Sequence, residues 1–310
     1  MHPIRIGVLG VGKIATDQHI PVLQNDKDFL FCAAASRHHR VENVDNFASV
    51  EAMLDSIALD AVSICTPPQN HFDAARLCLD RGKHVLLEKP PCVSTLQLDV
   101  LISLAREKNV SLFASWHSRF AAAVATTKKL LSNKQVLAAR IEWKEDVRRW
   151  HPGQTWIWQA GGFGVFDPGI NALSILTEVL AEDVFVERAV LSFPANCDAP
   201  IAAELALQTL AGASISAAFD FRHTGDQTWD IAVETGSETL LLSQGGDRLS
   251  IDGKAIDAGT ADQHAEYASL YRHFAKLVEA RRIDVDTRPF RLVADAFMLG
   301  RRVVVDGFHE

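Results

Sequence analysis

The feature that most constrains this chain is a strand that runs directly into a glycine turn. Residues 4–9 form a short apolar run rich in β-branched side chains, and an amphipathic segment to about Leu23 follows the turn. In the pattern Gly-x-Gly-x-x-Ala, the first glycine permits a tight turn and the second lets the backbone approach a pyrophosphate. Strand, turn and helix in this order are the context that dinucleotide binding requires. The turn residues expected to contact the cofactor are Gly10, Gly12, Lys13 and Ile14.

Apolar strand-like runs alternate with helix-like segments over the first part of the chain. This alternation predicts a doubly wound parallel sheet, a Rossmann domain, over residues 1–120. Beyond residue 120 the pattern changes to long alternating stretches without helices between them, which favours an open, mainly antiparallel sheet. The sequence thus predicts an α/β domain followed by an α+β domain over residues 121–310. Two closing helices are expected, near 262–280 and 291–305, the last one packing back on the first domain.

The loop after the second predicted strand bears on the choice of cofactor. An NAD-preferring site usually has an acidic residue there for the ribose 2′-hydroxyl. This chain has Ser36 and Arg37 instead, and a guanidinium can pair bidentately with a 2′-phosphate. The alternative is an ordinary basic surface loop. We expect NADP to be preferred and NAD to be accepted.

Two further strand ends are expected to face the cofactor, because open α/β sheets bind ligands at the carboxyl ends of their strands. One is the break at residues 66–71, where Thr66, Pro67 and His71 are expected near the nicotinamide ribose, with His71 in a packing role. The other follows the run 84–87, where Glu88 and Lys89 precede two prolines. A lysine there can hydrogen-bond a substrate oxygen or take its proton; the alternative is a solvated lysine.

Residues 143–158 contain four of the chain's six tryptophans, set among charged side chains. Aromatic planes mixed with Glu, Arg and His are typical of a carbohydrate pocket, in which rings stack on sugar C–H faces and charged groups bind the hydroxyls. The alternative is a packed subdomain interface, and both readings can hold for different rings. The residues expected to contact a sugar are Glu145, Trp150 and His151.

A glycine-rich segment then leads into a predicted helix that begins near Asp167. Asp167 is expected to be the N-cap, followed by Pro168 in the first helical position. Asn171 lies one turn later, so both side chains can point at the same ligand.

Composition excludes several classes of function. A formal net charge of −8 argues against a nucleic-acid partner. No apolar run approaches the roughly 20 residues of a membrane span, and the chain enters its first strand without a signal-like leader. The five cysteines are scattered among apolar runs, which is typical of reduced thiols in the cytoplasm. No metal-type clustering is present, so no metal is expected.

The glycine turn, the Glu88-Lys89-Pro90 run and the segment into Asp167 resemble the Gfo/Idh/MocA oxidoreductase family, and the resemblance covers the whole chain. More narrowly, residues 143–154 and 164–174 are similar to the bacterial D-galactose / L-arabinose 1-dehydrogenases of that family. The resemblance implies NAD(P)-dependent hydride transfer, a Rossmann domain, and homodimers or homotetramers formed through the second domain's sheet.

The resemblance implies that Lys89 is catalytic and that Asp167 shares in proton transfer. Many family members have a histidine where this chain has Asn171, and asparagine cannot act as a general base. Whether Lys89 or Asp167 accepts the proton therefore stays open. Asparagine is the expected residue in the sugar 1-dehydrogenase subgroup, so this departure also supports the narrower resemblance.

The expected reaction is oxidation of the C1 hydroxyl of a cyclic aldose (L-arabinose, D-galactose or D-fucose) to the lactone. Two alternatives remain: an enzyme, dehydrogenase or reductase, for another sugar or polyol, and a non-catalytic regulator that binds NADP. The residues expected to bind the sugar are Lys89, Glu145, Trp150, His151, Asp167 and Asn171.

Overall fold

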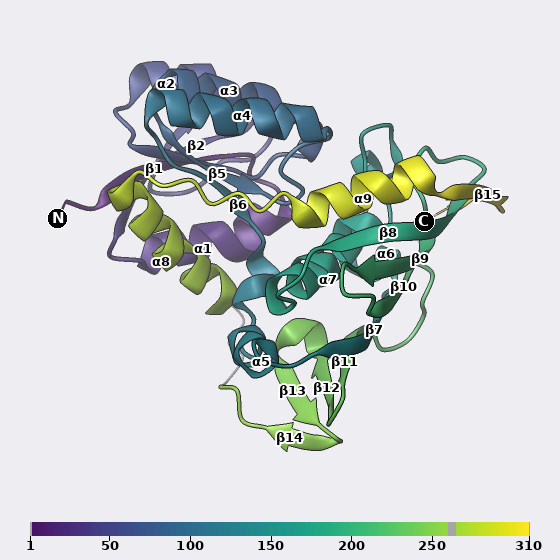
Figure 1. Cartoon of the computed structure of the whole chain (residues 1–310). Coiled ribbons are helices and arrows are strands. Elements are labelled where there is room, and N and C mark those ends of the chain that lie inside the picture. The colour runs from purple at the N-terminus through teal and green to yellow at the C-terminus, as the bar shows by residue number, and fades with distance from the viewer. Residues whose placement is uncertain (1, 260–264, 310) are drawn as a thin grey trace. The chain divides into compact units, whose positions relative to one another are not determined.

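The computed structural model describes residues 2–259 and 265–309, in which the chain forms two compact units (Figure 1). Unit 1 comprises Met1–Trp116 and Gln263–Asp286, and unit 2 comprises His117–Asp262 and Thr287–Glu310. The first unit is therefore completed by a segment from near the C-terminus. The helix in that segment is α8 (Ala265–Ala280), whereas the last helix, α9 (Arg288–Leu299), belongs to unit 2. The expectation that the last helix returns to the first domain is wrong in this respect, because α9 packs on elements of unit 2.

Unit 1 is built on a six-stranded parallel sheet in the order β3-β2-β1-β4-β5-β6. Strands β4, β5 and β6 are buried along their whole length, as expected for a sheet covered on both faces. The predicted doubly wound domain is confirmed. The strands are β1 (Ile4–Leu9), β2 (Phe29–Ala35), β3 (Asp45–Phe47), β4 (Ala61–Ile64), β5 (His84–Glu88) and β6 (Leu112–Ser115).

Helices lie on both faces of this sheet. Figure 1 shows α2, α3 and α4 on one face, and α1 and α8 on the other. Local signals set several ends: the Ser49 side chain accepts the Ala52 N–H and caps α2, and Asn109 ends α4 in the left-handed conformation. The remaining helices of the unit are the π-helical turn η1 (Ala15–His19), α1 (Ile20–Asn25), α2 (Val50–Ser56), η2 (Pro68–Asn70), α3 (His71–Asp80) and α4 (Thr95–Lys108).

Unit 2 is built on a nine-stranded sheet in the order β14-β13-β12-β11-β7-β10-β9-β8-β15. Among the described strands of this sheet only the pairs β7–β10 and β8–β15 are parallel, so the predicted mainly antiparallel sheet is confirmed. The strands are β7 (Val136–Lys144), β8 (Val184–Pro194), β9 (Ala202–Thr209), β10 (Ser214–Asp220), β11 (Thr228–Thr235), β12 (Thr239–Ser243), β13 (Arg248–Ile251), β14 (Lys254–Ile256) and β15 (Arg301–Val305).

The central helix of unit 2 is α7 (Phe166–Val179), which is buried along most of its length. At Gly169 a Cβ would lie 2.8 Å from the Phe219 ring of β10, so only glycine allows the helix to approach the sheet this closely. The other helices of the unit besides α9 are η3 (His117–Phe120), α5 (Val124–Leu131), α6 (Val147–Trp150), η4 (Thr155–Trp158) and η5 (Gln244–Gly246).

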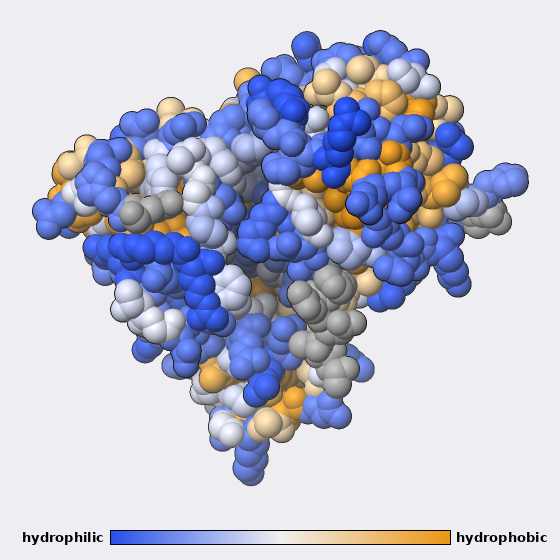
Figure 2. Space-filling model, turned by 180° about the vertical axis from the view of Figure 1, so that it is seen from behind, coloured by the Kyte–Doolittle hydropathy of each residue, from blue (hydrophilic) through white to orange (hydrophobic). Residues whose placement is uncertain are grey.

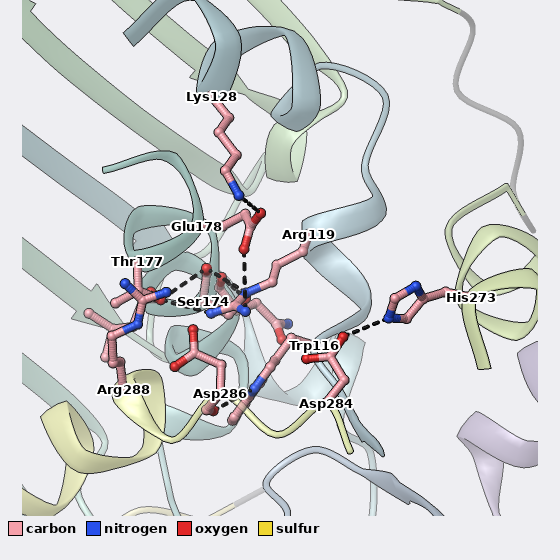
Figure 3. Close-up of polar contacts among 12 residues, drawn as sticks. Trp116, Arg119, Lys128, Ser174, Thr177, Glu178, His273, Asp284, Asp286 and Arg288 are labelled. Carbon is pink, nitrogen blue, oxygen red and sulfur yellow. Dashed lines mark hydrogen bonds and ion pairs between the residues drawn. The ribbon is translucent and has the colours of Figure 1, made fainter. Parts of the chain in front are cut away.

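Arginine and lysine side chains hold the C-terminal half of α7 in place (Figure 3). Arg119 Nε donates to the Ser174 carbonyl at 3.0 Å, and another guanidinium nitrogen donates to Thr177 Oγ1 at 3.0 Å. Glu178 pairs with Arg119 at 3.4 Å and with Lys128 at 2.6 Å. Because charged side chains meet the carbonyl end of the helix, the orientation of α7 is fixed from that end.

The predicted helix over 291–305 is only partly correct. The helix ends at Leu299, and after Gly300 the chain continues as β15, which pairs in parallel with β8. The run Val303-Val304-Val305 is β-branched and fits a strand better than a helix.

The surface is mainly polar. On the face shown in Figure 2, hydrophilic residues cover most of the surface and hydrophobic residues gather in separate patches. None of the helices in the described ranges combines the length and the apolar character that crossing a bilayer requires.

Candidate functional site

The glycine turn of unit 1 has the geometry that a bound pyrophosphate requires. Gly10 has φ +89°, and a Cβ there would lie 2.8 Å from the backbone nitrogen of Thr66, so glycine is needed. At Gly12, by contrast, a Cβ would meet nothing within 4 Å, and the backbone there is open to a ligand. The helical turn η1 follows at once, with its first N–H groups near the glycine turn. The residues present therefore fit a dinucleotide phosphate.

Two side chains of the turn lie at its outer surface. Lys13 is exposed and forms an ion pair with Asp17, one turn later. Ile14 is half-buried and precedes η1.

The loop after β2 presents a cation. Ser36 Oγ accepts the N–H groups of His38 and His39, at 3.4 and 3.3 Å, which shapes the loop and leaves its own hydrogen free to be donated. Arg37 is exposed, and it makes no hydrogen bond or ion pair with the rest of the described chain. An unpaired guanidinium beside a hydroxyl donor fits a phosphate group.

The loop after β4 carries an unsatisfied hydroxyl. Thr66 Oγ1 is buried, and no described residue hydrogen-bonds it. Pro67 next to it is half-buried. His71 is fully buried, with Nε2 2.6 Å from the Thr66 carbonyl and Nδ1 3.3 Å from the Pro91 carbonyl. Burial lowers the pKa of His71, so the ring is neutral and donates one hydrogen bond to Thr66. His71 thus packs between two loops, and its side chain faces protein rather than ligand.

Glu88 is the last residue of β5 and Lys89 follows it, and the two side chains lie in different surroundings. Glu88 is 3 % exposed; its Oε1 is 3.0 Å from His19 Nε2 and accepts the Tyr267 hydroxyl at 2.8 Å. Its Oε2 accepts the backbone N–H of Lys89 at 2.8 Å. The Glu88 carboxylate is therefore engaged inside unit 1, while the Lys89 side chain is half-buried. We call the buried polar residues around this carboxylate the Glu88 network: His19, Ser63, Glu88, Tyr267 and Tyr271.

In unit 2 the helix start differs from the expectation. Val165 is the N-cap residue of α7, and Asp167 lies inside the first turn, where its N–H donates to the Gly164 carbonyl. The reason is that Gly164, at φ +52°, already turns the chain into the helix. The Asp167 carboxylate, 4 % exposed, is thus not used as a cap.

Four polar side chains in unit 2 form a continuous row, which we call the Glu145 row: Trp229, Glu145, His151 and Asp167. Trp229 Nε1 donates to Glu145 Oε2 at 2.8 Å, and Glu145 Oε1 lies 3.1 Å from His151 Nε2. His151 Nδ1 lies 3.7 Å from Asp167 Oδ2. One imidazole therefore stands between two buried carboxylates, an arrangement suited to holding or moving a proton.

Tryptophan rings and an amide lie in the same unit. The rings of Trp150 and Trp229 are 5.0 Å apart at 55°, and Trp150 is half-buried. Trp143 is buried. It faces Trp229 across the β7–β11 pair, and the two rings stack with their centroids 5.9 Å apart. Asn171, one turn after Asp167, has a buried Oδ1 without a hydrogen-bond partner in the described part of the chain. Trp143 packs in the interior, as the interface reading expects. Trp150 keeps a partly exposed ring, and its contact with a sugar stays a prediction.

The structure thus brings Gly10 and Thr66 together in unit 1, and Glu145, His151 and Asp167 together in unit 2. In the described ranges no group of three or more His, Cys, Asp or Glu side chains is placed to hold a metal ion.

Sequence reasoning missed three side chains that complete these sites. Trp229 lies near the start of β11, and its aromatic type was the only signal. Tyr267 and Tyr271 are the two tyrosines of the chain and are spaced four apart on one helix, which was a usable signal for a shared partner.

Comparison with known proteins agrees with this architecture. Residues 4–115 match the model of an oxidoreductase family with an NAD-binding Rossmann fold, GFO_IDH_MocA. The galactose 1-dehydrogenase of Pseudomonas fluorescens is 42% identical over 311 residues, covering 100% of both chains. The crystal structure of a D-galactose-1-dehydrogenase from Rhizobium etli is 50% identical, with a TM-score of 0.94, and covers 100% of this chain and 99% of that one.

A more distant structure shares the fold alone. KijD10, a 3-ketoreductase from Actinomadura kijaniata in complex with NADP and TDP-benzene, is 20% identical with a TM-score of 0.83, covering 98% of this chain and 99% of that one. Since a full-length relative at 42% identity accompanies the match of the nucleotide-binding domain, the chain belongs to the Gfo/Idh/MocA family of oxidoreductases with an NAD-binding Rossmann fold.

Proposed function

We propose that this protein oxidises the C1 hydroxyl of a cyclic aldose to the lactone, with D-galactose, L-arabinose and D-fucose as substrates and NADP as the preferred cofactor. The observation that carries the proposal is the Glu145 row, in which an imidazole links the buried Glu145 and Asp167 carboxylates beside tryptophan rings. The full-length similarity to the galactose 1-dehydrogenase of Pseudomonas fluorescens supports it.

The cofactor would be held by unit 1. The open backbone at Gly12 would accept the pyrophosphate, the unsatisfied Thr66 hydroxyl would bind the ribose, and Arg37 would pair with the 2′-phosphate of NADP. When bound, the nicotinamide ring supplies the two-electron acceptor for the oxidation.

The residues of the chain manage the proton. Oxidation of C1–OH to a carbonyl releases the hydroxyl proton as well as the hydrogen on carbon. We assign acceptance of that proton to Lys89 and orientation of the hydroxyl to Asp167, whose carboxylate lies 3.7 Å from His151 Nδ1. Because His151 also contacts Glu145, the imidazole has a fixed orientation when Asp167 binds the substrate.

Recognition of the remaining hydroxyls falls to Asn171 and to His151 Nδ1, which lies 3.7 Å from Asp167 Oδ2, beyond hydrogen-bond distance. The unsatisfied Oδ1 of Asn171 needs a donor, and a sugar hydroxyl supplies one. Trp150 offers a half-buried ring for the C–H face of the sugar. Glu145, with both oxygens engaged by Trp229 and His151, acts on the sugar mainly by holding those two side chains.

The three substrates share one configuration from C2 to C4 and differ in the substituent at C5. A single small group in a mainly apolar setting changes transition-state binding by roughly 1–3 kcal/mol, so all three sugars are expected to be turned over.

Initial rates of NADP and NAD reduction with D-galactose, L-arabinose, D-fucose, D-xylose, D-glucose and myo-inositol test the proposal. Rates confined to the first three sugars, and faster with NADP, are expected. Turnover of myo-inositol or D-xylose alone would show a different substrate. Tight NADP binding without turnover of any of these compounds would favour a cofactor-binding regulator.

We also propose that copies of the chain associate as a homodimer or homotetramer through the sheet of unit 2. Light scattering coupled to gel filtration measures the mass in solution, and a monomer would contradict this.

A further inference from the structure

The Glu88 network is a cluster of hydrogen-bonded polar side chains in the interior of unit 1. Its members come from four elements: His19 from η1, Ser63 from β4, Glu88 from β5, and both tyrosines from α8. All five are buried, with exposed fractions of 0 to 3 %. Burying this many polar groups costs free energy unless each is hydrogen-bonded.

The hydrogen bonds account for each group in turn. His19 Nε2 faces Glu88 Oε1 at 3.0 Å, and His19 Nδ1 faces the Tyr271 hydroxyl at 2.7 Å. The Tyr271 hydroxyl donates to Ser63 Oγ at 3.1 Å. Tyr267 donates its hydroxyl to the same Glu88 oxygen that faces His19. The network therefore converges on one carboxylate.

The charges in the network are complementary. Burial by itself lowers the pKa of His19, but Cys65, Tyr271 and the hydrogen bond to Glu88 outweigh burial and raise this pKa well above its ordinary value. His19 is thus an imidazolium that donates from both nitrogens. Burial, followed by the Glu88 charge, raises the pKa of Tyr267, so its hydroxyl keeps its proton and donates. Glu88 receives one charged and one neutral donor on Oε1.

The second oxygen of Glu88 has a different task. Oε2 accepts the backbone N–H of Lys89 at 2.8 Å, so the carboxylate fixes the main chain from which the Lys89 side chain extends. We propose that His19, Tyr267 and Glu88 are positioning residues for Lys89. They hold the main chain of Lys89 at a fixed position relative to the glycine turn. This inference rests on the proposed catalytic role of Lys89.

Two observations favour positioning over simple packing. First, apolar side chains of similar size would fill the same space at no electrostatic cost, and such replacements of buried ion pairs are often neutral or stabilising. Second, His19 ends a π-helical turn that follows the glycine turn directly, and single π-helical turns occur frequently at functional sites. The network therefore connects three parts of unit 1 by hydrogen bonds: η1 after the glycine turn, α8, and the main chain of Lys89.

The experiment compares Tyr267→Phe and Glu88→Gln with Ser111→Ala in the full-length protein. Tyr267→Phe removes one donor to Glu88. Glu88→Gln replaces one acceptor oxygen by an amide N–H₂, so either the Lys89 N–H or the two donors at Oε1 lose their acceptor. Ser111 provides the control, because its buried hydroxyl donates to the Leu277 carbonyl of α8 at 2.7 Å and forms no hydrogen bond with a network member among the residues described.

Displacement of a reacting group by about 1 Å costs roughly 100-fold in rate. We therefore expect kcat for D-galactose to fall about 10-fold in Tyr267→Phe and about 100-fold in Glu88→Gln, with KM and the Kd for NADP changed by less than about 3-fold. Ser111→Ala is expected to lower Tm while keeping the wild-type kcat. A fall in Tm without any change in kcat in both network variants would overturn the inference.

A double-mutant cycle separates this inference from the proposed function. If Glu88 acts through Lys89, Glu88→Gln has no further effect on kcat in the Lys89→Ala background, whereas independent effects would multiply. An inactive Lys89→Ala together with wild-type kcat in Glu88→Gln and Tyr267→Phe would refute positioning alone. Wild-type kcat in Lys89→Ala would refute the proposed role of Lys89, and positioning would fail with it.

Discussion

Both units bury a glutamate among polar side chains, and what surrounds the two carboxylates is different. In unit 1, Glu88 Oε1 is hydrogen-bonded to His19 and Tyr267, and Oε2 accepts the Lys89 backbone N–H. The His19 and Tyr267 side chains are themselves buried. In unit 2, Glu145 contacts His151, and His151 in turn lies beside Asp167. The His151 side chain is 16% exposed. One network is closed and the other reaches a surface.

The difference separates two uses of buried charge. A closed network has no group left for a ligand, so it can only hold other atoms in place. An open row retains polar atoms at its end, and the unsatisfied Asn171 Oδ1 lies one turn from the carboxylate of Asp167 in α7. The comparison predicts that changes in the open row alter substrate handling, and changes around the closed network alter geometry or stability.

The largest effect is expected at Lys89, whose backbone N–H donates to Glu88 and whose side chain extends away from the closed network. Lys89→Ala removes the proposed proton acceptor, so kcat for D-galactose is expected to fall by at least about 100-fold, the usual size of general acid–base contributions. Initial rates at saturating sugar and NADP measure it. Lys83→Ala, which alters a half-buried lysine just before the same strand, is the control. A kcat near that of the wild type in Lys89→Ala would remove Lys89 from the mechanism.

A change in the open row comes next. Glu145→Gln keeps an acceptor for Trp229 but turns an amide N–H₂ toward His151, which loses its charged partner. Hydrogen bonds to charged groups contribute about 1.5–3 kcal/mol, so kcat/KM for D-galactose should fall roughly 10- to 150-fold, and Tm should fall too because the lost bond is buried. Glu142→Gln, which breaks the ion pair between half-buried Glu142 and exposed Arg140 on the same strand, should change kcat/KM less than about 2-fold. Equal losses in both variants would argue against a special role of the row.

A stability effect is expected from a histidine of unit 1 that serves only the fold. His84 Nδ1 accepts the Ser111 N–H at 2.9 Å, and burial, with a smaller effect of Arg281, lowers its pKa to about 4. Because the unfolded chain takes up the proton near pH 6.5 and the folded one does not, stability is full above that pH and falls as pH decreases toward 4. The loss between pH 7.5 and pH 5 is about 2 kcal/mol.

Urea unfolding at the two pH values measures this loss. His84→Gln retains an acceptor for Ser111 but has no group that titrates, so its stability should depend less on pH by about the same 2 kcal/mol. The same pH dependence in both proteins would contradict the assignment.

The smallest effect concerns an exposed residue outside both networks. Arg37→Ala should raise KM for NADP about 10-fold and leave KM for NAD unchanged, because only NADP carries the 2′-phosphate. Arg40→Ala, an exposed arginine of the same loop, serves as the control. Equal effects on the two cofactors would show that Arg37 does not contact the 2′-phosphate.

Local patterns in the sequence sufficed for the two-part architecture and for the backbone geometry of the glycine turn. Gly10 and Gly12 follow a strand, and their roles depend only on backbone conformation, which a short motif specifies. The alternation of strands and helices predicted the parallel sheet, because a βαβ connection admits few other arrangements. Asp167 and Asn171 were placed on one helix face by their spacing alone.

Tertiary structure alone decided which side chains share a hydrogen bond. The bond from Tyr267 to Glu88 joins residues 179 positions apart, and the bond from Trp229 to Glu145 joins residues 84 positions apart. Helical or strand periodicity reports only which residues share a face within one element. Which faces meet depends on packing between elements far apart in the chain. This packing buried the Glu88 carboxylate among His19, Tyr267 and the Lys89 backbone.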